Sequence, residues 1–195
     1  MLRAGVVGLG DMGSGLAKNL IKNGITTTGL DLSDERMNAF VEMRGTPAGS
    51  VAELGTNSDA VFVMVMNGIQ AKAVILGDDG LVAHMPKGGA VILTATIKPS
   101  EARYIGTALE GSGIHLIDSP VSGGFPGAQA GALTMMAAAT SEVLDQYKPI
   151  MDAVSKTIHR VGTQAGDGQV MKSCLQTLIG SIFGAKFEAA ALAAQ

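Results

Sequence analysis

The sequence predicts a doubly wound α/β fold with a mostly parallel sheet, followed by a long helix that begins an all-α second domain. Three observations support this prediction. Short apolar runs alternate with longer amphipathic segments, which is typical of repeated strand-helix units. A glycine-rich turn over residues 8–13 joins the first apolar run to the first amphipathic segment. From about residue 164 onward, apolar residues recur at helical spacing without an intervening proline.

The predicted elements alternate along the chain. Segments with the length and apolar content of buried strands are residues 2–8, 26–31, 60–66, 90–93, 114–117, 133–138 and 156–159. Amphipathic helices are expected between them, at residues 13–22, 33–43, 69–76, 99–109 and 141–151. Ser33 and Ser141 stand where a helix N-terminus favours a capping hydroxyl. Helices between consecutive strands supply the crossovers that a parallel sheet requires.

The last segment is expected to be one continuous helix. Its apolar stripe consists of Val170, Cys174, Leu178, Ile182, Ala185, Ala189 and Leu192. Gly180 and Gly184 each disfavour a helix by about 1 kcal/mol relative to Ala, although two glycines one turn apart also let another helix approach closely. About 28 helical residues extend about 42 Å, beyond what a domain of this size covers. We therefore expect a first domain over residues 1–163, and over 164–195 an interdomain helix that starts an incomplete helical domain.

Composition excludes several classes of function. The net charge is -3 and Lys and Arg form no run, so neither a nucleic acid nor a membrane surface is an expected partner. No apolar run approaches the length of a membrane span, and the N-terminal residues do not resemble a signal peptide. Cys174 is the only cysteine, which predicts a reducing, cytoplasmic location. The three histidines lack metal-ligand spacing, so no metal is expected.

The glycine-rich turn predicts a dinucleotide site of the Rossmann type. It lies between a predicted strand and a predicted helix and reads Gly8-Leu9-Gly10-Asp11-Met12-Gly13. The first glycine permits the tight turn, the second lets backbone amides approach a pyrophosphate, and the third lets helix and strand pack closely. The helix N-terminus supplies free N–H groups and a positive dipole to the phosphates.

Asp31 bears on the choice of dinucleotide. It ends the second predicted strand, where a carboxylate can accept hydrogen bonds from both adenosine ribose hydroxyls. A 2'-phosphate would meet like charge there. Arg36 could hold such a phosphate, but Leu32 and Ser33, not an arginine, directly follow Asp31. The expected cofactor is therefore NAD, with NADP as the less favoured alternative.

Three motifs, in order, resemble the beta-hydroxyacid dehydrogenase family, which includes 3-hydroxyisobutyrate dehydrogenase and tartronate semialdehyde reductase. The first runs from Gly8 through Leu20. The second is Asp118-Ser119-Pro120-Val121-Ser122-Gly123-Gly124, followed by Gly127-Ala128, Gly131 and Leu133-Thr134. The third is Gly166-Asp167-Gly168-Gln169, leading into Lys172. The resemblance covers essentially the whole chain. It implies an NAD(P)-dependent oxidoreductase that transfers a hydride between NAD(H) and a small beta-hydroxyacid or its semialdehyde or keto form.

The resemblance also implies roles for residues of the second and third motifs. Ser122 and the backbone at Gly123 and Gly124 would bind the substrate carboxylate or hydroxyl, since a glycine pair after a strand exposes N–H groups to an anion. Lys172 would be the general acid/base, because an alkoxide is too basic to form without a positioned proton carrier. Without the resemblance, a tight turn and a solvated helical lysine would explain the same residues.

One position departs from the family pattern. The family usually has two asparagines three and four positions after the lysine, where this chain has Leu175 and Gln176. Gln176 lies one helical turn beyond Lys172 and is expected to replace the second amide at the substrate.

Further cofactor contacts are expected beyond the carboxyl ends of two other strands. Met66 ends the strand at 60–66 and Asn67 directly follows it, and both are expected near the adenosine. Thr96, after the strand at 90–93, is placed near the nicotinamide. Turn formation and helix capping are the alternative roles for Asn67 and Thr96.

Other functional hypotheses remain open at this point. The chain as it stands could be an NAD-binding module without turnover, a related reductase of aldehyde acids that uses NADPH, or an interaction protein that uses its last helix. In the family, an all-helical second domain closes over the substrate and subunits pair. The resemblance therefore implies a small hydroxyacid substrate and a homodimer or homotetramer.

Overall fold

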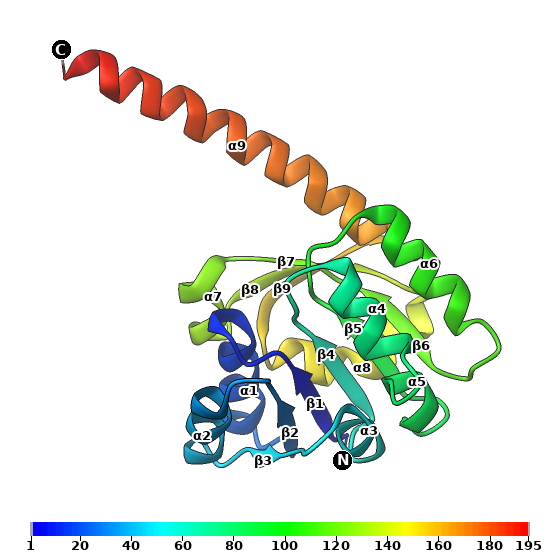
Figure 1. The fold of residues 1–195 in the computed structure, drawn as a ribbon. Helices are drawn as coiled ribbons and strands as arrows, with labels where there is room; N and C mark the ends of the chain where they lie inside the picture. Colours follow the sequence, from blue (N-terminus) through cyan, green and yellow to red (C-terminus); the bar gives the residue numbers. More distant parts are fainter. Residues whose placement is uncertain (1, 195) are drawn as a thin grey trace.

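The computed structural model describes residues 2–194 and shows one twisted sheet flanked by helices, from which a long helix projects (Figure 1). The strands are β1 Ala4–Val7, β2 Thr27–Leu30, β3 Thr46–Pro47, β4 Ala60–Val63, β5 Ala90–Leu93, β6 His115–Asp118, β7 Val121–Ser122, β8 Leu133–Ala138 and β9 Ser155–Gly162. The helices are α1 Asp11–Lys22, α2 Asp34–Glu42, α3 Val51–Thr56, α4 Gly68–Leu76, α5 Leu81–His84, α6 Pro99–Leu109, α7 Gly124–Ala130, α8 Ser141–Asp152 and α9 Asp167–Ala193.

The sheet is doubly wound, as the sequence predicted. The strand order is β3-β2-β1-β4-β5-β6-β8-β7, and β9 pairs with β8. The pairings from β3 across to β6 are all parallel, whereas β8 is antiparallel to β6 and β7. β1 lies between β2 and β4, so the direction of winding reverses beside β1. In such sheets ligands bind beyond the carboxyl ends of the strands at this reversal.

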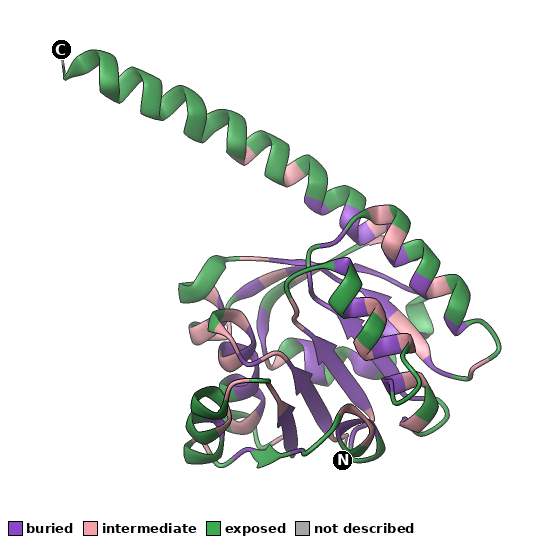
Figure 2. Cartoon of the chain, in the orientation of Figure 1, coloured by how far each residue is buried: buried purple, intermediate pink, exposed green. Residues whose placement is uncertain are grey.

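Two apolar cores, one on each face, hold the sheet between its helices. Neighbouring residues of one strand enter opposite cores: Val6 belongs to the core that includes residues of α1 and α8, and Val7 belongs to the core that includes residues of α3 to α6. In Figure 2 the central strands β1, β4 and β5 are accordingly buried along their length, whereas β3 and much of β9 are exposed. Parallel strands covered on both faces are apolar throughout, which is why they were readable from the sequence as continuous apolar runs.

Several predicted boundaries were wrong, and five short elements were not predicted. Helix α1 begins at Asp11, not at residue 13, because Gly10 is extended and serves as its N-cap. The N-cap of α8 is Thr140, one residue before the expected Ser141, whereas Ser33 caps α2 as expected. The unpredicted elements are β3, α3, α5, β7 and α7. Each is too short for periodicity to reveal it, and α7 contains glycine and proline that favour a turn.

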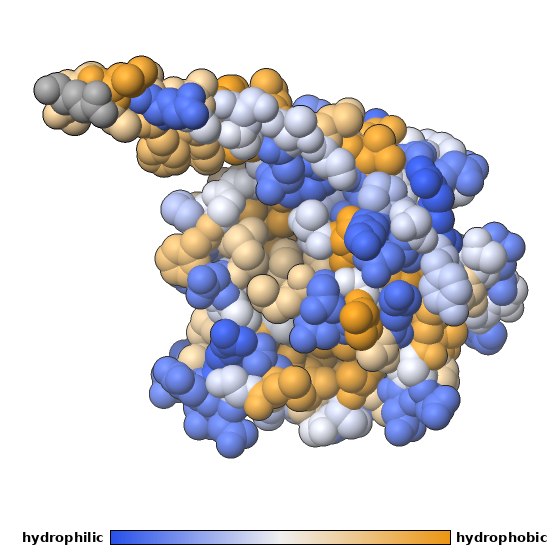
Figure 3. Space-filling model, turned by 45° about the horizontal axis from the view of Figure 1, so that its top comes forward, coloured by the Kyte–Doolittle hydropathy of each residue, from blue (hydrophilic) through white to orange (hydrophobic). Residues whose placement is uncertain are grey.

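Helix α9 is unbroken over its 27 residues and leaves the body of the domain, as predicted. Its buried residues are Gly168, Gln169 and Lys172, all in its first two turns. Farther along, the large apolar side chains are exposed, and Figure 3 shows apolar surface along this projection. Within residues 2–194, no helix is both long and apolar enough to cross a membrane, and no group of three His, Cys, Asp or Glu could hold a metal ion.

Candidate active site and cofactor cleft

The turn between β1 and α1 is shaped by backbone contacts that leave no room for side chains. Gly8 has a φ of 90°, and a Cβ placed there would lie 2.2 Å from the carbonyl oxygen of Met64. A Cβ on Gly13 would lie 1.7 Å from the carbonyl oxygen of Gly8. At Gly10 the nearest atoms to such a Cβ belong to the Arg36 guanidinium, at 3.7 Å. The turn is therefore closed at its base and open to a ligand at Gly10.

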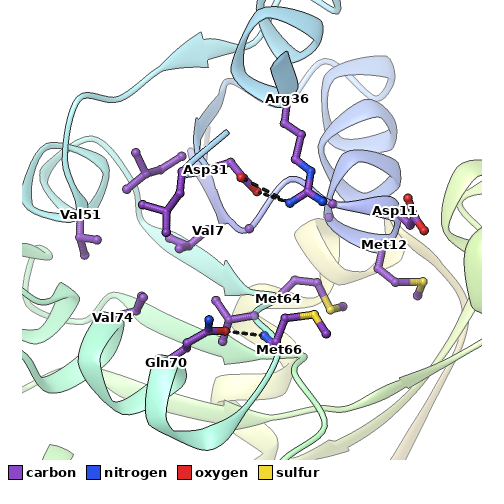
Figure 4. A pocket seen from close by; sticks show the side chains of 16 residues that line it. Val7, Asp11, Met12, Asp31, Arg36, Val51, Met64, Met66, Gln70 and Val74 are labelled. Carbon is purple, nitrogen blue, oxygen red and sulfur yellow. Dashed lines mark hydrogen bonds and ion pairs between the residues drawn. The ribbon is translucent and has the colours of Figure 1, made fainter. Parts of the chain in front are cut away.

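Asp31 is tied to this turn by hydrogen bonds. Its Oδ2 accepts from the backbone N–H of Leu9 at 2.7 Å, and its Oδ1 accepts from that of Ser33 at 2.9 Å. The Arg36 guanidinium lies 3.4 Å from Oδ2. The carboxylate at the end of β2 is thus held at a fixed position beside the glycine-rich turn, as Figure 4 shows.

These groups open onto a cleft of about 570 Å³, a size typical of small-molecule sites. Its apolar wall includes Val51, Val65 and Val74, and Arg36 and Gln70 face each other across it (Figure 4). Seven of the predicted cofactor residues line it: Gly8, Gly10, Asp11, Met12, Gly13, Asp31 and Met66. The side chain of Leu9 packs into the core instead, so only its backbone belongs to the site.

A second hollow of about 360 Å³ lies between the β4–α4 turn, the β5–α6 turn and α9. Asn67 and Thr96 line it together with Met66, Lys98 and Ser173. The Oδ1 of Asn67 accepts from the backbone N–H of Gln70 at 3.0 Å and caps α4. The capping role that was the alternative for Asn67 is therefore present.

Lys172 meets the predicted substrate turn. Its Nζ donates to the carbonyl oxygen of Val121 at 2.8 Å, directly before Ser122. Gly123 and Gly124 follow with φ values of 131° and 59°, so the turn requires glycine at both positions. The Lys172 side chain is buried, and this burial lowers the pKa of its amine. Gln176 lies one turn farther along α9 and is exposed.

The substrate turn and the glycine-rich turn are joined through their helices. A Cβ on Gly15 of α1 would lie 2.6 Å from the backbone of Ala128 in α7, the helix that begins at Gly124. The Nδ2 of Asn19 donates to the carbonyl oxygen of Ala128 at 2.9 Å. The packing of α1 against α7 therefore holds the glycine-rich turn and the predicted substrate turn together.

Two buried residues near Lys172, Asp118 and Gln169, belong to the family motifs, but no role was predicted for them. Asp118 ends β6 and Gln169 lies in the first turn of α9, and both are fully buried. The Gln169 amide donates to the Asp118 carboxylate at 2.9 Å. Burial raises the pKa of Asp118, and its hydrogen bonds to Gln169 and to the start of α9 oppose that change. The sequence signal that could have indicated a role for Asp118 was a carboxylate at the end of a mostly apolar strand.

Known proteins resemble this chain in sequence and in fold. The family described as the NAD binding domain of 6-phosphogluconate dehydrogenase matches residues 3–162. An L-threonate dehydrogenase of Escherichia coli is 36% identical over 195 residues, which cover 98% of this chain and 64% of that protein. An NAD-dependent L-serine dehydrogenase of Pseudomonas aeruginosa is 34% identical, over 98% of this chain and 64% of its own length.

A crystal structure of 3-hydroxyisobutyrate dehydrogenase from Salmonella typhimurium superimposes with a TM-score of 0.92 at 33% identity, covering 100% of this chain and 68% of that one. The chain belongs to the beta-hydroxyacid dehydrogenase family, of which it contains the NAD-binding domain. The resemblance inferred from three motifs is therefore confirmed. The chain spans 64% of the length of the two curated relatives described above.

Proposed function

We propose that this protein is an NAD-dependent dehydrogenase of small beta-hydroxyacids, with Lys172 as the general acid/base. The observation that carries the proposal is the position of the Lys172 amine. Its Nζ is buried and lies 2.8 Å from the Val121 carbonyl oxygen, beside a glycine turn that can bind an anion. The names of the relatives, which are dehydrogenases of L-threonate and L-serine, support a substrate of this class.

The cleft at the β1–α1 turn fits a dinucleotide, because Gly10 has no side chain of its own where a pyrophosphate would approach the backbone. When bound, NAD supplies the nicotinamide carbon that accepts or donates the hydride. Asp31 would accept hydrogen bonds from the adenosine ribose hydroxyls with the lone pairs that Leu9 and Ser33 leave free. Its charge would disfavour the 2'-phosphate of NADP. We place Met66 and Asn67 toward the adenosine and Thr96 toward the nicotinamide.

The substrate turn would bind the carboxylate of the hydroxyacid. Two successive left-handed glycines, Gly123 and Gly124, present backbone N–H groups without flanking side chains, and Ser122 adds a hydroxyl donor. Gln176 is exposed one turn beyond Lys172 and would add an amide to the substrate hydroxyls.

Lys172 would move the proton. In the oxidation direction the neutral amine takes the hydroxyl proton from the substrate, and in the reduction direction the ammonium returns it to the carbonyl oxygen. Burial lowers the pKa of this amine and so increases the neutral fraction at neutral pH. The bond to Val121 fixes the direction in which Nζ points.

We further propose that residues 1–163 form the NAD-binding domain, and that 164–195 form an interdomain helix at the start of a helical domain. The exposed apolar side chains of α9 would be covered by that domain or by a second subunit, in a cytoplasmic homodimer or homotetramer. They include Leu178, Ile182, Phe183, Phe187 and Leu192.

The test is a panel of small hydroxyacids, including L-threonate, L-serine and 3-hydroxyisobutyrate, assayed with NAD and NADP by absorbance of the reduced cofactor. Calorimetry measures binding of both cofactors in parallel. We expect turnover with at least one hydroxyacid, and higher kcat/KM with NAD. Binding of NAD without turnover on any member would instead support an NAD-binding module, since the chain spans 64% of the length of the L-threonate dehydrogenase.

A further inference from the structure

The first turn of α9 is anchored to the sheet by a buried pair, Asp118 and Gln169, each with an exposed fraction of 0%. The Oδ2 of Asp118 accepts from the backbone N–H of Gly166 at 2.8 Å and from that of Gln169 at 3.3 Å. Its Oδ1 accepts from the Nε2 of Gln169 at 2.9 Å. All of these partners donate, so the geometry suits a carboxylate that carries its charge.

Asp118 supplies the side-chain hydrogen-bond acceptor that α9 lacks at its N-terminus. The N-cap of α9 is Gly166, which has no side chain to accept from the free N–H groups of the first turn. Asp118, from the end of β6, accepts from two of them, and its negative charge faces the positive end of the helix dipole. The position of α9 is thus fixed by a residue about 50 positions earlier in the chain.

Gln169 extends this anchor to the β5–α6 turn. Its Oε1 accepts from the backbone N–H of Ile97 at 3.1 Å, and its Nε2 also donates to the carbonyl oxygen of Ala95 at 3.1 Å. These two residues flank Thr96, whose own side chain is exposed. Gln169 also precedes Lys172 by three positions, so the two side chains emerge from the same face of the helix. One amide therefore links the turn that carries Thr96 to the helix that carries Lys172.

We propose that Asp118 and Gln169 are positioning residues that hold the Thr96 turn and the Lys172 amine at a fixed separation. The inference rests on the proposed function, in which the nicotinamide lies at Thr96 and the substrate hydroxyl at Lys172. Hydride and proton leave neighbouring atoms of one substrate, so the two protein elements must keep their spacing for both transfers to occur. Neither residue exchanges a proton with the substrate.

Substitutions can break the hydrogen bond between the Asp118 and Gln169 side chains and then restore it. Asp118→Asn places an amide donor against the Gln169 amide, and Gln169→Glu places two carboxylates in contact. The double variant restores a hydrogen bond between the two side chains, but the glutamate at position 169 cannot donate to the Ala95 carbonyl oxygen, so that bond to the Thr96 turn stays broken. We expect each single change to lower kcat by about 10²-fold, as a displacement near 1 Å can, and the double variant to recover only part of that loss because it restores one of the two contacts of the Gln169 amide group. Binding of ADP-ribose at the Asp31 cleft should change little in all three variants.

A matched control separates positioning from general stability. Tyr147→Phe, on helix α8, removes the hydrogen bond that the Tyr147 hydroxyl donates to the Gly88 carbonyl oxygen and the one that it accepts from the Gln146 side chain. It should lower the melting temperature without changing kcat of the folded protein. If a single variant of the pair does not fold, Gln169→Met, which is apolar and nearly the same length, is assayed in its place.

A second readout does not depend on turnover. The pKa of Lys172 is measured by NMR on lysine labelled with ¹³C at Cε, with the signal assigned by Lys172→Arg. In wild type it should lie below the ordinary lysine value, and in Gln169→Met, which changes no charge, it should rise as the first turn of α9 loosens. Wild-type kcat in the folded single variants, together with a wild-type Lys172 pKa in Gln169→Met, would overturn the proposal. A wild type without turnover would defeat the proposed function, and the titration would still test the anchor.

Discussion

The two halves of the site are built in different ways. The cofactor cleft is organised mainly by one continuous segment, residues 8–13, whose shape follows from Gly8 and Gly13, which admit no Cβ. The proton-transfer half joins the end of β6, the substrate turn and the start of α9 through side-chain hydrogen bonds such as that from Lys172 to Val121. Backbone shape dictates the first half, and long-range polar contacts dictate the second. Substitutions should therefore affect binding in one half and chemistry in the other.

The largest expected effect lies in the second half. Lys172→Ala removes the proposed proton carrier, so turnover should fall by about 10² to 10⁴-fold while NAD binding stays nearly intact. Steady-state kinetics on the best hydroxyacid of the panel, with calorimetry for NAD, measure the two quantities. Turnover close to wild type in this variant would remove the lysine from the mechanism.

Asp31→Ala should act on the first half. Loss of one hydrogen bond to a charged acceptor costs about 1.5–3 kcal/mol, and a net loss equal to one such bond predicts NAD binding about 10-fold to 100-fold weaker, with better tolerance of NADP. Asp31→Asn keeps an acceptor for the Leu9 N–H group and so separates loss of charge from collapse of the turn. The ratio of kcat/KM for NAD and NADP is the measurement. A wild-type preference for NADP would contradict the role given to Asp31.

A smaller effect tests whether backbone shape governs the cleft. The methyl group of Gly13→Ala would collide with the Gly8 carbonyl oxygen, and we expect a loss of about 1–3 kcal/mol in the free energy of unfolding, with weaker NAD binding. Gly180→Ala is the matched control, because no heavy atom lies within 4 Å of that position on the exposed part of α9. It should be neutral or stabilise the helix by up to about 1 kcal/mol. Equal losses at the two positions in urea titrations would refute the steric account.

The contrast between backbone shape and long-range polar contacts explains which parts of the fold and site could be predicted from the sequence. The strands at 90–93 and 133–138 and the helix at 99–109 were predicted with their observed bounds, because both faces of the sheet are covered and the apolar runs are continuous. The glycine-rich turn was equally readable. Elements such as α5 and β7 are too short to show a period.

The proton-transfer half was placed by family resemblance alone. No local pattern states that Lys172 reaches Val121, or that Asp118 caps a helix about 50 residues away. Such contacts depend on the topology of the sheet, which brings the ends of β6 and β7 to the start of α9. Asp118 and Gln169 therefore received no role until the fold placed them side by side.

The pH dependence of hydroxyacid oxidation tests the role of Lys172 most directly. The amine must be neutral to accept the substrate proton, so kcat should rise with pH and level off at the pKa of Lys172, which burial lowers from the ordinary lysine value. Between these two pKa values the unfolded chain binds more protons than the folded one, so the free energy of unfolding should also rise with pH there. The account predicts that the rising limb of kcat is present in wild type and lost from the residual activity of Lys172→Ala. The same limb at the same pH in both proteins would contradict it.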